Sequence, residues 1–254
     1  MIVLLHGFTG DRTTWDEVIE HWQLEQPPWT LDLPGHGGAV EVADGWEGNL
    51  EALRQRLGAE PAATTIVGYS LGARVALGLV AADAASRAVL ISVNAGIPEE
   101  ERVARRQSDR RWVDLLRGVG EQGGRGGGDG EGEIQAFVSQ WQAQPLFASQ
   151  RQVSAERRAR RDEVRRRQRP EALARSLENM GLAEMPDYRP LIPALASRLT
   201  LVVGAQDAKF CALADDLVAQ APALSLHRVP DAGHDVPLEQ PRALAVLLGE
   251  LLRR

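Results

Sequence analysis

The sequence is poor in cysteine and lysine: its 254 residues include one cysteine, Cys211, and one lysine, Lys209, among 29 basic residues. A single cysteine excludes an internal disulfide and a metal site built from several cysteines. The formal net charge of −6 argues against duplex nucleic acid as a partner. No apolar run approaches membrane-spanning length, and no N-terminal secretory signal is recognisable. We expect a soluble cytoplasmic protein, a monomer or weak oligomer.

Short apolar runs alternate with helical patterns along most of the chain. The alternation predicts a mostly parallel, doubly wound sheet. The expected strands are residues 1–5, 29–33, 65–67, 87–94, 199–204 and 225–229, and the expected helices include residues 11–22, a segment around 50–57, one after Ser70, and 241–252.

Residues 97–190 break this alternation with arginine-rich helical sequence. We expect a helical lid inserted into a core formed by residues 1–96 and 191–254. Within the lid, residues 118–133 are rich in glycine and of low complexity. Such sequence cannot bury enough apolar area to offset its ordering entropy, so we expect a flexible surface loop there.

The stretch Gly68-Tyr69-Ser70-Leu71-Gly72 follows an apolar run and precedes helix-forming residues. This order of strand, sharp turn and helix is typical of an elbow that exposes a nucleophilic serine. A serine in such an elbow needs an acid and a histidine, which follow it in that order along the chain.

Asp207 and His234 each follow a later predicted strand, so both can meet Ser70 at the carboxyl edge of the sheet. A catalytic triad is favoured over the alternative of a capping aspartate and a turn histidine. Asp32 is rejected as the acid because its strand precedes the serine.

The loop after the first strand, His6-Gly7-Phe8, is placed to complete an oxyanion hole. The expected donors are the backbone N–H groups of Phe8 and Leu71. The other histidines are expected to be structural: His6 in this loop, His36 in a turn, and His21 and His227 on the surfaces of a helix and a strand.

Arginines beside the elbow and in the lid are candidate anion ligands. Arg74 lies one turn past Ser70, where a guanidinium could clamp a carboxylate or phosphate. Arg105 and one arginine of the cluster 157–169 are further candidates, although most of that cluster is expected to be solvated. The aromatic residues expected to line the pocket are Tyr69, Trp141 and Phe147, with core packing the favoured alternative for Phe147.

Several stretches together resemble one family, the 2-succinyl-6-hydroxy-2,4-cyclohexadiene-1-carboxylate synthases (MenH type) of the α/β-hydrolase fold. They are HGFTGDRTTW, DLPGHG, VGYSLGARVAL, RRQSDRRWV, WQAQPLFAS, GAQDAKF and AGHDVPLEQP. VGYSLGAR alone indicates only the fold, whereas the two lid stretches RRQSDRRWV and WQAQPLFAS are specific to this branch. The family usually has a strand pair before the HGF strand. Either one sheet edge is shortened here or the true start lies upstream.

The resemblance implies a lyase that eliminates pyruvate from 2-succinyl-5-enolpyruvyl-6-hydroxy-3-cyclohexene-1-carboxylate, with no metal or organic cofactor. It carries the triad onto Ser70, Asp207 and His234. It carries the anion-binding arginines onto Arg74, Arg105 and Arg165, and pocket positions onto Tyr69 and Trp141. The alternatives are a carboxylester or carbon–carbon hydrolase that acts on an anionic substrate through an acyl-enzyme, and a binding protein that kept the fold.

Overall fold

The core of the molecule is a six-stranded sheet, seen in a computed structural model that describes residues 1–58, 60–119 and 130–253. The strand order is β2-β1-β3-β4-β5-β6, and each neighbouring pair is parallel. The strands are β1 (Ile2–Leu5), β2 (Trp29–Leu31), β3 (Thr65–Tyr69), β4 (Arg87–Ile91), β5 (Leu199–Gly204) and β6 (Ser225–Val229). The predicted parallel, doubly wound sheet is therefore confirmed.

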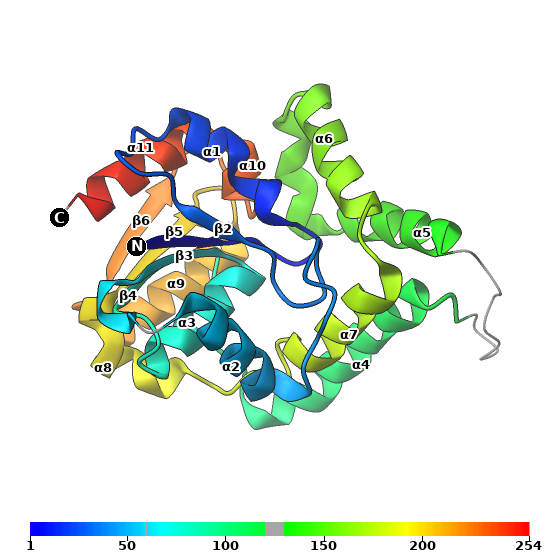
Figure 1. Ribbon diagram of the computed structural model, residues 1–254, viewed down its shortest axis with the longest axis horizontal. Coiled ribbons are helices and arrows are strands. Elements are labelled where there is room, and N and C mark those ends of the chain that lie inside the picture. The colour runs from blue at the N-terminus through cyan, green and yellow to red at the C-terminus, as the bar shows by residue number, and fades with distance from the viewer. Residues whose placement is uncertain (59, 120–129, 254) are drawn as a thin grey trace.

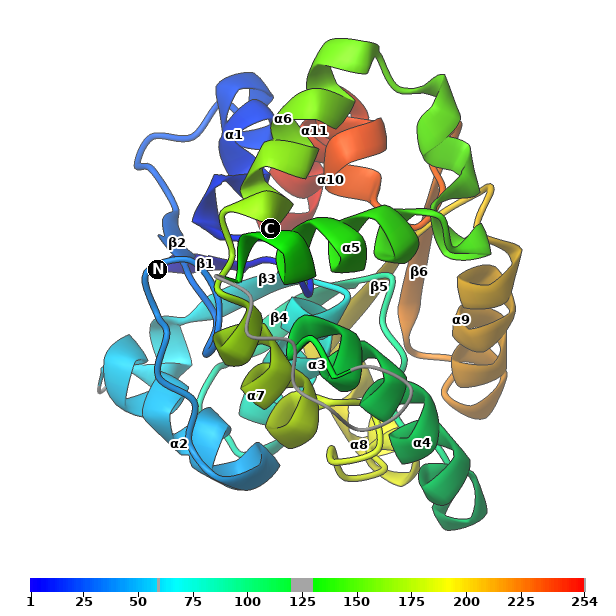
Figure 2. The ribbon, with the colours of Figure 1, turned by 90° about the vertical axis from the view of Figure 1, so that its right-hand side faces the viewer.

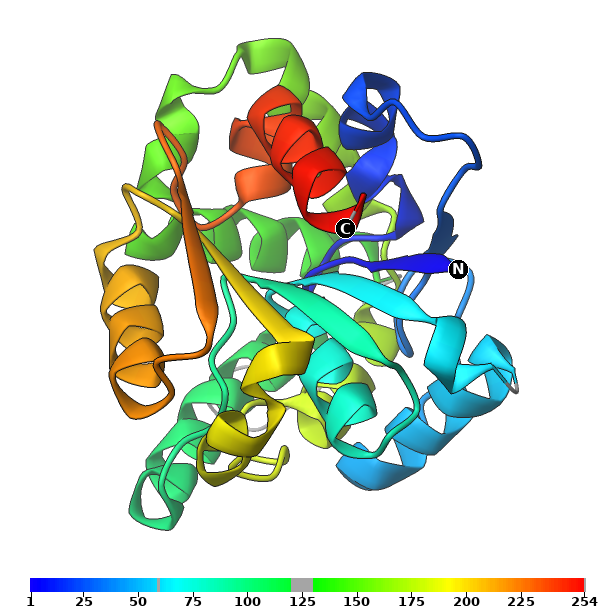
Figure 3. The same cartoon turned by 90° about the vertical axis from the view of Figure 1, so that its left-hand side faces the viewer.

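Helices cover both faces of this sheet (Figure 3). One face packs against α2 (Gly45–Leu57), α3 (Leu71–Ala81) and α9 (Ala208–Gln220). The other packs against α1 (Asp16–His21) and α11 (Pro241–Leu252). The shorter helices are η2 (Pro61–Ala63), η4 (Arg189–Leu191), α8 (Ile192–Leu195), η5 (Ala196–Arg198) and α10 (Val236–Glu239).

Strand β3 shows why the sheet is buried on both sides. Successive side chains of a strand point to opposite faces, so Ile66 joins the α2–α3–α9 core and Val67 joins the α1–α11 core. Both are apolar and fully buried. Such a continuous apolar run is typical of a central parallel strand. It fixes the end of β3, and with it Ser70, at the middle of the carboxyl edge.

The chain between β4 and β5 forms a group of helices to one side of the sheet (Figures 1 and 2). It comprises α4 (Glu99–Leu116), α5 (Glu131–Gln142), η3 (Pro145–Gln152), α6 (Ala155–Arg166) and α7 (Pro170–Met180), here called the helical insertion. Val113, Phe137 and Leu173 belong to an apolar cluster of its own. Residues 120–129 of the predicted glycine-rich loop lie outside the described residues. Its end is helical, because α5 begins at Glu131.

Several predicted elements differ in their bounds. The strand expected over residues 87–94 ends at Ile91, and the one expected over residues 65–67 extends to Tyr69. The helix expected over residues 11–22 divides into a 3-10 helix, η1 (Arg12–Trp15), and α1, and Asp11 caps η1 by accepting from Thr13 N. The strand expected over residues 29–33 ends at Leu31. Asp32 then accepts hydrogen bonds from the backbone N–H groups of Arg12 and Gly38, which turns the chain out of the sheet.

Across the three described ranges, no helix has both the length and the apolar character needed to cross a membrane.

Candidate active site

Ser70 lies at a sharp turn between β3 and α3, as the glycine pattern around it predicts. Its φ of 52° and ψ of −106° place it in a left-handed region that side chains rarely adopt. Close backbone contacts impose this turn: a Cβ at Gly68 would overlap the Gly72 carbonyl, and one at Gly72 would overlap the Leu5 carbonyl. The strained turn presents Ser70 Oγ at the carboxyl edge of the sheet.

His234 connects Ser70 to Asp207. Its Nε2 lies 3.2 Å from Ser70 Oγ, and its Nδ1 lies 2.9 Å from Asp207 Oδ2. The other carboxylate oxygen of Asp207 accepts from Phe210 N, which caps the start of α9. His234 and Asp207 are both buried. The structure therefore brings the three predicted triad residues together, with the acid fixed by the helix that follows it.

The loop that carries His234 is held by buried hydrogen bonds. Glu239 accepts from the backbone N–H groups of Gly233 (2.7 Å) and Asp235 (3.2 Å), the two residues that flank His234. Ser92 Oγ donates to the His234 carbonyl at 3.0 Å. Burial raises the pKa of the Glu239 carboxyl. Sequence reasoning did not single out Glu239 or Ser92, because their partners are backbone groups that only the fold brings near.

A cavity of about 610 Å³ opens onto the triad. Its volume lies in the range of small-molecule sites, roughly 300–1,000 Å³. Helices of the core and of the insertion both contribute to its wall. Among the predicted site residues, those that line it are Phe8, Ser70, Leu71, Arg74, Arg105, Trp141, Asp207 and His234. The two expected oxyanion donors, Phe8 and Leu71, thus adjoin the same space as the serine.

Arg74 is a half-buried cation at this cavity. Its Nη1 donates to the Met180 carbonyl at 2.9 Å, at the end of α7. Burial, together with the charge of nearby Arg105, lowers its pKa to about 9. Throughout the described part of the chain, no carboxylate forms an ion pair with Arg74. An anionic ligand in the cavity would therefore be stabilised by the charge of Arg74.

Arg105 reaches the same cavity from α4. Its Nε lies 3.0 Å from both carboxylate oxygens of Asp109, one turn along the helix. This pairing orients the guanidinium and leaves its terminal nitrogens for other partners. The sequence motif contained Asp109, but its role depends on the helical register and was not predicted.

Three other predicted pocket residues, Tyr69, Phe147 and Arg165, line a separate cavity of about 40 Å³, not the larger one. The small cavity also reaches Ser70 and His234. Arg165 donates to Asp162 at 3.1 Å, and its guanidinium lies 5.5 Å from the centre of the Phe147 ring. Burial, followed by the charge of Arg161, lowers the pKa of Arg165. Phe147 is buried, as the core-packing alternative expects, but it also lines the small cavity beside Ser70.

Of the four histidines predicted to be structural, His6 and His36 are buried, His21 is exposed and His227 is half-buried. His6 accepts a hydrogen bond from Leu33 N at 3.0 Å, and His36 Nδ1 lies within hydrogen-bond distance, 3.0 Å, of the Pro34 carbonyl oxygen. Both histidines therefore stabilise the loops beside the elbow. Burial, with a further contribution from His6, lowers the pKa of His36 to about 3. Asp32 contacts backbone groups and lies away from the triad.

Sequence reasoning missed several polar residues that line the cavity: Ser92, Asn94, Gln144, Ser149, Gln206 and Lys209. Of these, Lys209 carried a signal in the sequence. It is the only lysine of the chain and lies two positions after Asp207. Within residues 1–58, 60–119 and 130–253, no group of three or more His, Cys, Asp and Glu side chains is arranged to hold a metal ion.

The strained serine turn, the histidine and acid that follow it in chain order, and the parallel sheet define a protein of the α/β-hydrolase class. The model of the "Alpha/beta hydrolase family" matches residues 2–247. Among solved structures, MenH from S. aureus superposes with a TM-score of 0.86 at 26% identity, covering 99% of this chain and 92% of the other. A thermophilic esterase from Thermogutta terrifontis gives 0.77 at 24% identity, covering 99% and 89%, and shows the fold alone.

Curated relatives show which family of the α/β-hydrolase class the chain belongs to. Proteins named 2-succinyl-6-hydroxy-2,4-cyclohexadiene-1-carboxylate synthase from Escherichia coli O157:H7 (strain EC4115) and K12 (strain DH10B) are 32% and 33% identical to this chain. Each alignment covers 99% of this chain and 93% of the relative. The chain belongs to the 2-succinyl-6-hydroxy-2,4-cyclohexadiene-1-carboxylate synthase family, and the predicted resemblance is confirmed.

Proposed function

We propose that this protein is a lyase of menaquinone biosynthesis. It eliminates pyruvate from 2-succinyl-5-enolpyruvyl-6-hydroxy-3-cyclohexene-1-carboxylate and releases 2-succinyl-6-hydroxy-2,4-cyclohexadiene-1-carboxylate. The observation that carries the proposal is the 32% identity over 99% of the chain to proteins named for this activity. The cationic cavity beside the triad supports it independently.

The charges of the cavity suit this substrate. The substrate carries three carboxylates, on the ring, on the succinyl chain and on the enolpyruvyl group. Arg74 and Arg105 supply positive charge on one side of the cavity, in a protein whose formal net charge is −6. The half-buried Arg74 guanidinium, which has no carboxylate partner among the described residues, binds an anion at a smaller desolvation cost, because the protein has already removed part of its hydration.

In the reaction, Ser70 acts as a base on the substrate. His234 takes the Ser70 hydroxyl proton, and Asp207 holds the imidazole with Nδ1–H directed away from the serine. Ser70 Oγ removes the proton from ring carbon 2, beside the succinyl ketone, and the ketone becomes an enolate. The electron pair then moves through the ring double bond and breaks the carbon–oxygen bond, so that enolpyruvate leaves as an anion. The proton held by His234 passes to it, which yields pyruvate and returns the triad to its starting state.

The backbone N–H groups of Phe8 and Leu71 stabilise the enolate oxygen. Helices α4 to α7 form a lid that excludes water from the cavity. Trp141 and Leu146, which come from this insertion and line the cavity, support that role. We assign the enzyme to the cytoplasm, with this small polycarboxylate as its partner.

The test follows pyruvate release from enzymatically generated substrate, with simple nitrophenyl esters as the contrast. We expect rapid pyruvate release and little ester hydrolysis. Rapid ester hydrolysis without pyruvate release would favour the second candidate, a hydrolase acting through an acyl-enzyme. The geometry of Ser70 and His234 is compatible with that chemistry too.

A further inference from the structure

Lys209 is a cation in a position that local structure does not explain. It is the only lysine among the 29 basic residues of the chain. It lies in the first turn of α9, directly after Ala208, and lines the 610 Å³ cavity. The positive end of the helix dipole disfavours a cation in a first turn. Its place at the cavity therefore calls for another explanation.

The Lys209 ammonium forms no ion pair with the carboxylates that the structure describes. Its Nζ instead lies 5.9 Å from the centre of the Phe210 ring. Many arginines of this chain, in contrast, are held in ion pairs, as are Arg117 with Glu178 and Arg198 with Asp83. The lysine charge is therefore available to a ligand in the cavity.

Lys209 and Arg74 approach the cavity from different helices. Arg74 lies on α3, which follows β3, and Lys209 lies on α9, which follows β5. Strand β4 separates those two strands, so their ends are roughly 10 Å apart at the usual strand spacing. Arg105 belongs to the Arg74 side, because its charge depresses the pKa of Arg74. The cavity thus has two positive ends.

We propose that Lys209 binds the substrate carboxylate that lies farthest from Arg74 and Arg105, an inference that rests on the proposed function. It makes the enzyme specific for substrates that are acidic at both ends. The exposed ammonium is a hydrated point charge on a flexible stem, so it stabilises a carboxylate through charge without imposing a bidentate geometry. An arginine can substitute for it in part, whereas a neutral side chain of similar length cannot.

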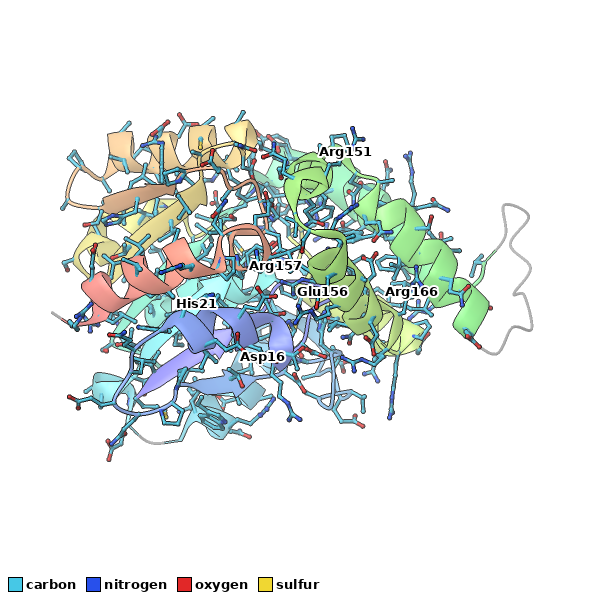
Figure 4. All side chains as sticks on the ribbon, turned by 90° about the horizontal axis from the view of Figure 1, so that it is seen from above. Asp16, His21, Arg151, Glu156, Arg157 and Arg166 are labelled. Atoms are coloured by element: carbon cyan, nitrogen blue, oxygen red, sulfur yellow. The ribbon has the colours of Figure 1, made fainter. Side chains whose placement is uncertain are left out.

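The kinetic test compares Lys209→Met, Lys209→Arg and wild type in the pyruvate-release assay at low and high salt. The control is Arg166→Met, which removes an exposed cation of α6 outside the cavity (Figure 4). For Lys209→Met we expect KM to rise by about tenfold or more, kcat to change little, and the salt dependence of kcat/KM to weaken. Lys209→Arg should recover most of the loss, and Arg166→Met should match wild type.

A second readout does not depend on turnover. Reductive methylation with ¹³C-formaldehyde places one lysine dimethylamine signal in the NMR spectrum, because Lys209 is the only lysine. The N-terminal amine gives a separate signal that serves as the internal control. Addition of the cyclohexadiene product, or of pyruvate, should shift the lysine signal. The ligand that shifts it carries the carboxylate that Lys209 binds.

The outcomes distinguish the proposed role of Lys209 from the proposed lyase function. An active wild type whose lysine signal moves with neither ligand, and whose Lys209→Met variant behaves like Arg166→Met, overturns the role of Lys209 and leaves the proposed function intact. A wild type that releases no pyruvate overturns the proposed function, and the inference with it.

Discussion

Arg161 of the helical insertion and Asp235 of the core form a buried ion pair. Arg161 Nη2 lies 3.3 Å from Asp235 Oδ1, and the two side chains are only 8% and 3% exposed. Arg161 also donates to Thr14 Oγ1 at 2.8 Å. Asp235 directly follows His234, so the pair joins α6 to the loop that carries His234. Beside it, Arg157 of α6, labelled in Figure 4, pairs with Glu17 of α1.

Breaking this pair should destabilise the protein. In Arg161→Met the Asp235 carboxylate stays buried without its cation, and the free energy of unfolding should fall by about 3–5 kcal/mol. The double variant Arg161→Met/Asp235→Asn removes both charges and should regain much of that loss, because asparagine can still cap α10. Urea unfolding of the single and double variants measures both effects. Equal losses in the two would show that the buried charge is not the cause.

Substitution of Arg74 should lower kcat/KM without lowering the free energy of unfolding. Arg74→Met removes a half-buried cation that has no ion-pair partner among the described residues, so the free energy of unfolding should stay about the same or rise. In the pyruvate-release assay kcat/KM should fall, because a substrate carboxylate loses its partner. The loss of transition-state stabilisation should be about 2 kcal/mol or more. Arg74→Lys keeps the charge and should lie between the two. Wild-type kinetics in Arg74→Met would contradict the anion-binding role.

His36 should make the protein less stable in acid. Its pKa in the folded state is about 3, below the value of 6.5 for an ordinary histidine. Between these values the unfolded chain binds a proton that the folded protein does not, so stability is lost as pH falls below about 6.5. From pH 7 to pH 5 the loss through His36 should be about 2 kcal/mol.

The matched variants are His36→Asn and His21→Asn. Asparagine at position 36 can still donate to the Pro34 carbonyl but does not titrate in this range. His21 is exposed and controls for removal of an imidazole. Urea unfolding at pH 7 and pH 5 should show a smaller acid loss in His36→Asn only. An unchanged pH dependence in that variant would assign the acid loss to other groups.

The sequence predicted the parts of the site that depend on chain order. A glycine pattern after an apolar run predicts the elbow, and Asp207 and His234 follow later strands whose ends meet at one edge. Which cationic side chains line the large cavity could not be predicted in full. Arg165, on α6, lines the small cavity, whereas Lys209, on α9, lines the large one, and the packing of helices from distant parts of the chain decides which cavity each side chain reaches. That packing depends on contacts between residues far apart in sequence, which local periodicity does not encode.

Ser70 distinguishes the two chemistries that the same geometry permits. Both need His234 to take the serine proton and Asp207 to hold the imidazole, so Ser70→Ala and Asp207→Asn should each lower kcat by orders of magnitude. Loss of activity therefore supports the triad without choosing between a base and a nucleophile.

Intact-protein mass spectrometry during turnover makes that choice. If Ser70 acts as a base, no bond to Oγ forms and the protein mass stays constant, whereas a hydrolase carries an acyl group between its two steps. Deuterium at ring carbon 2 should slow turnover in the base mechanism, because that carbon–hydrogen bond breaks in the proposed step. A substrate-derived mass on Ser70 that appears and decays at the turnover rate, with no isotope effect, would instead establish the acyl-enzyme. We expect constant mass and a primary isotope effect wherever proton removal limits the rate.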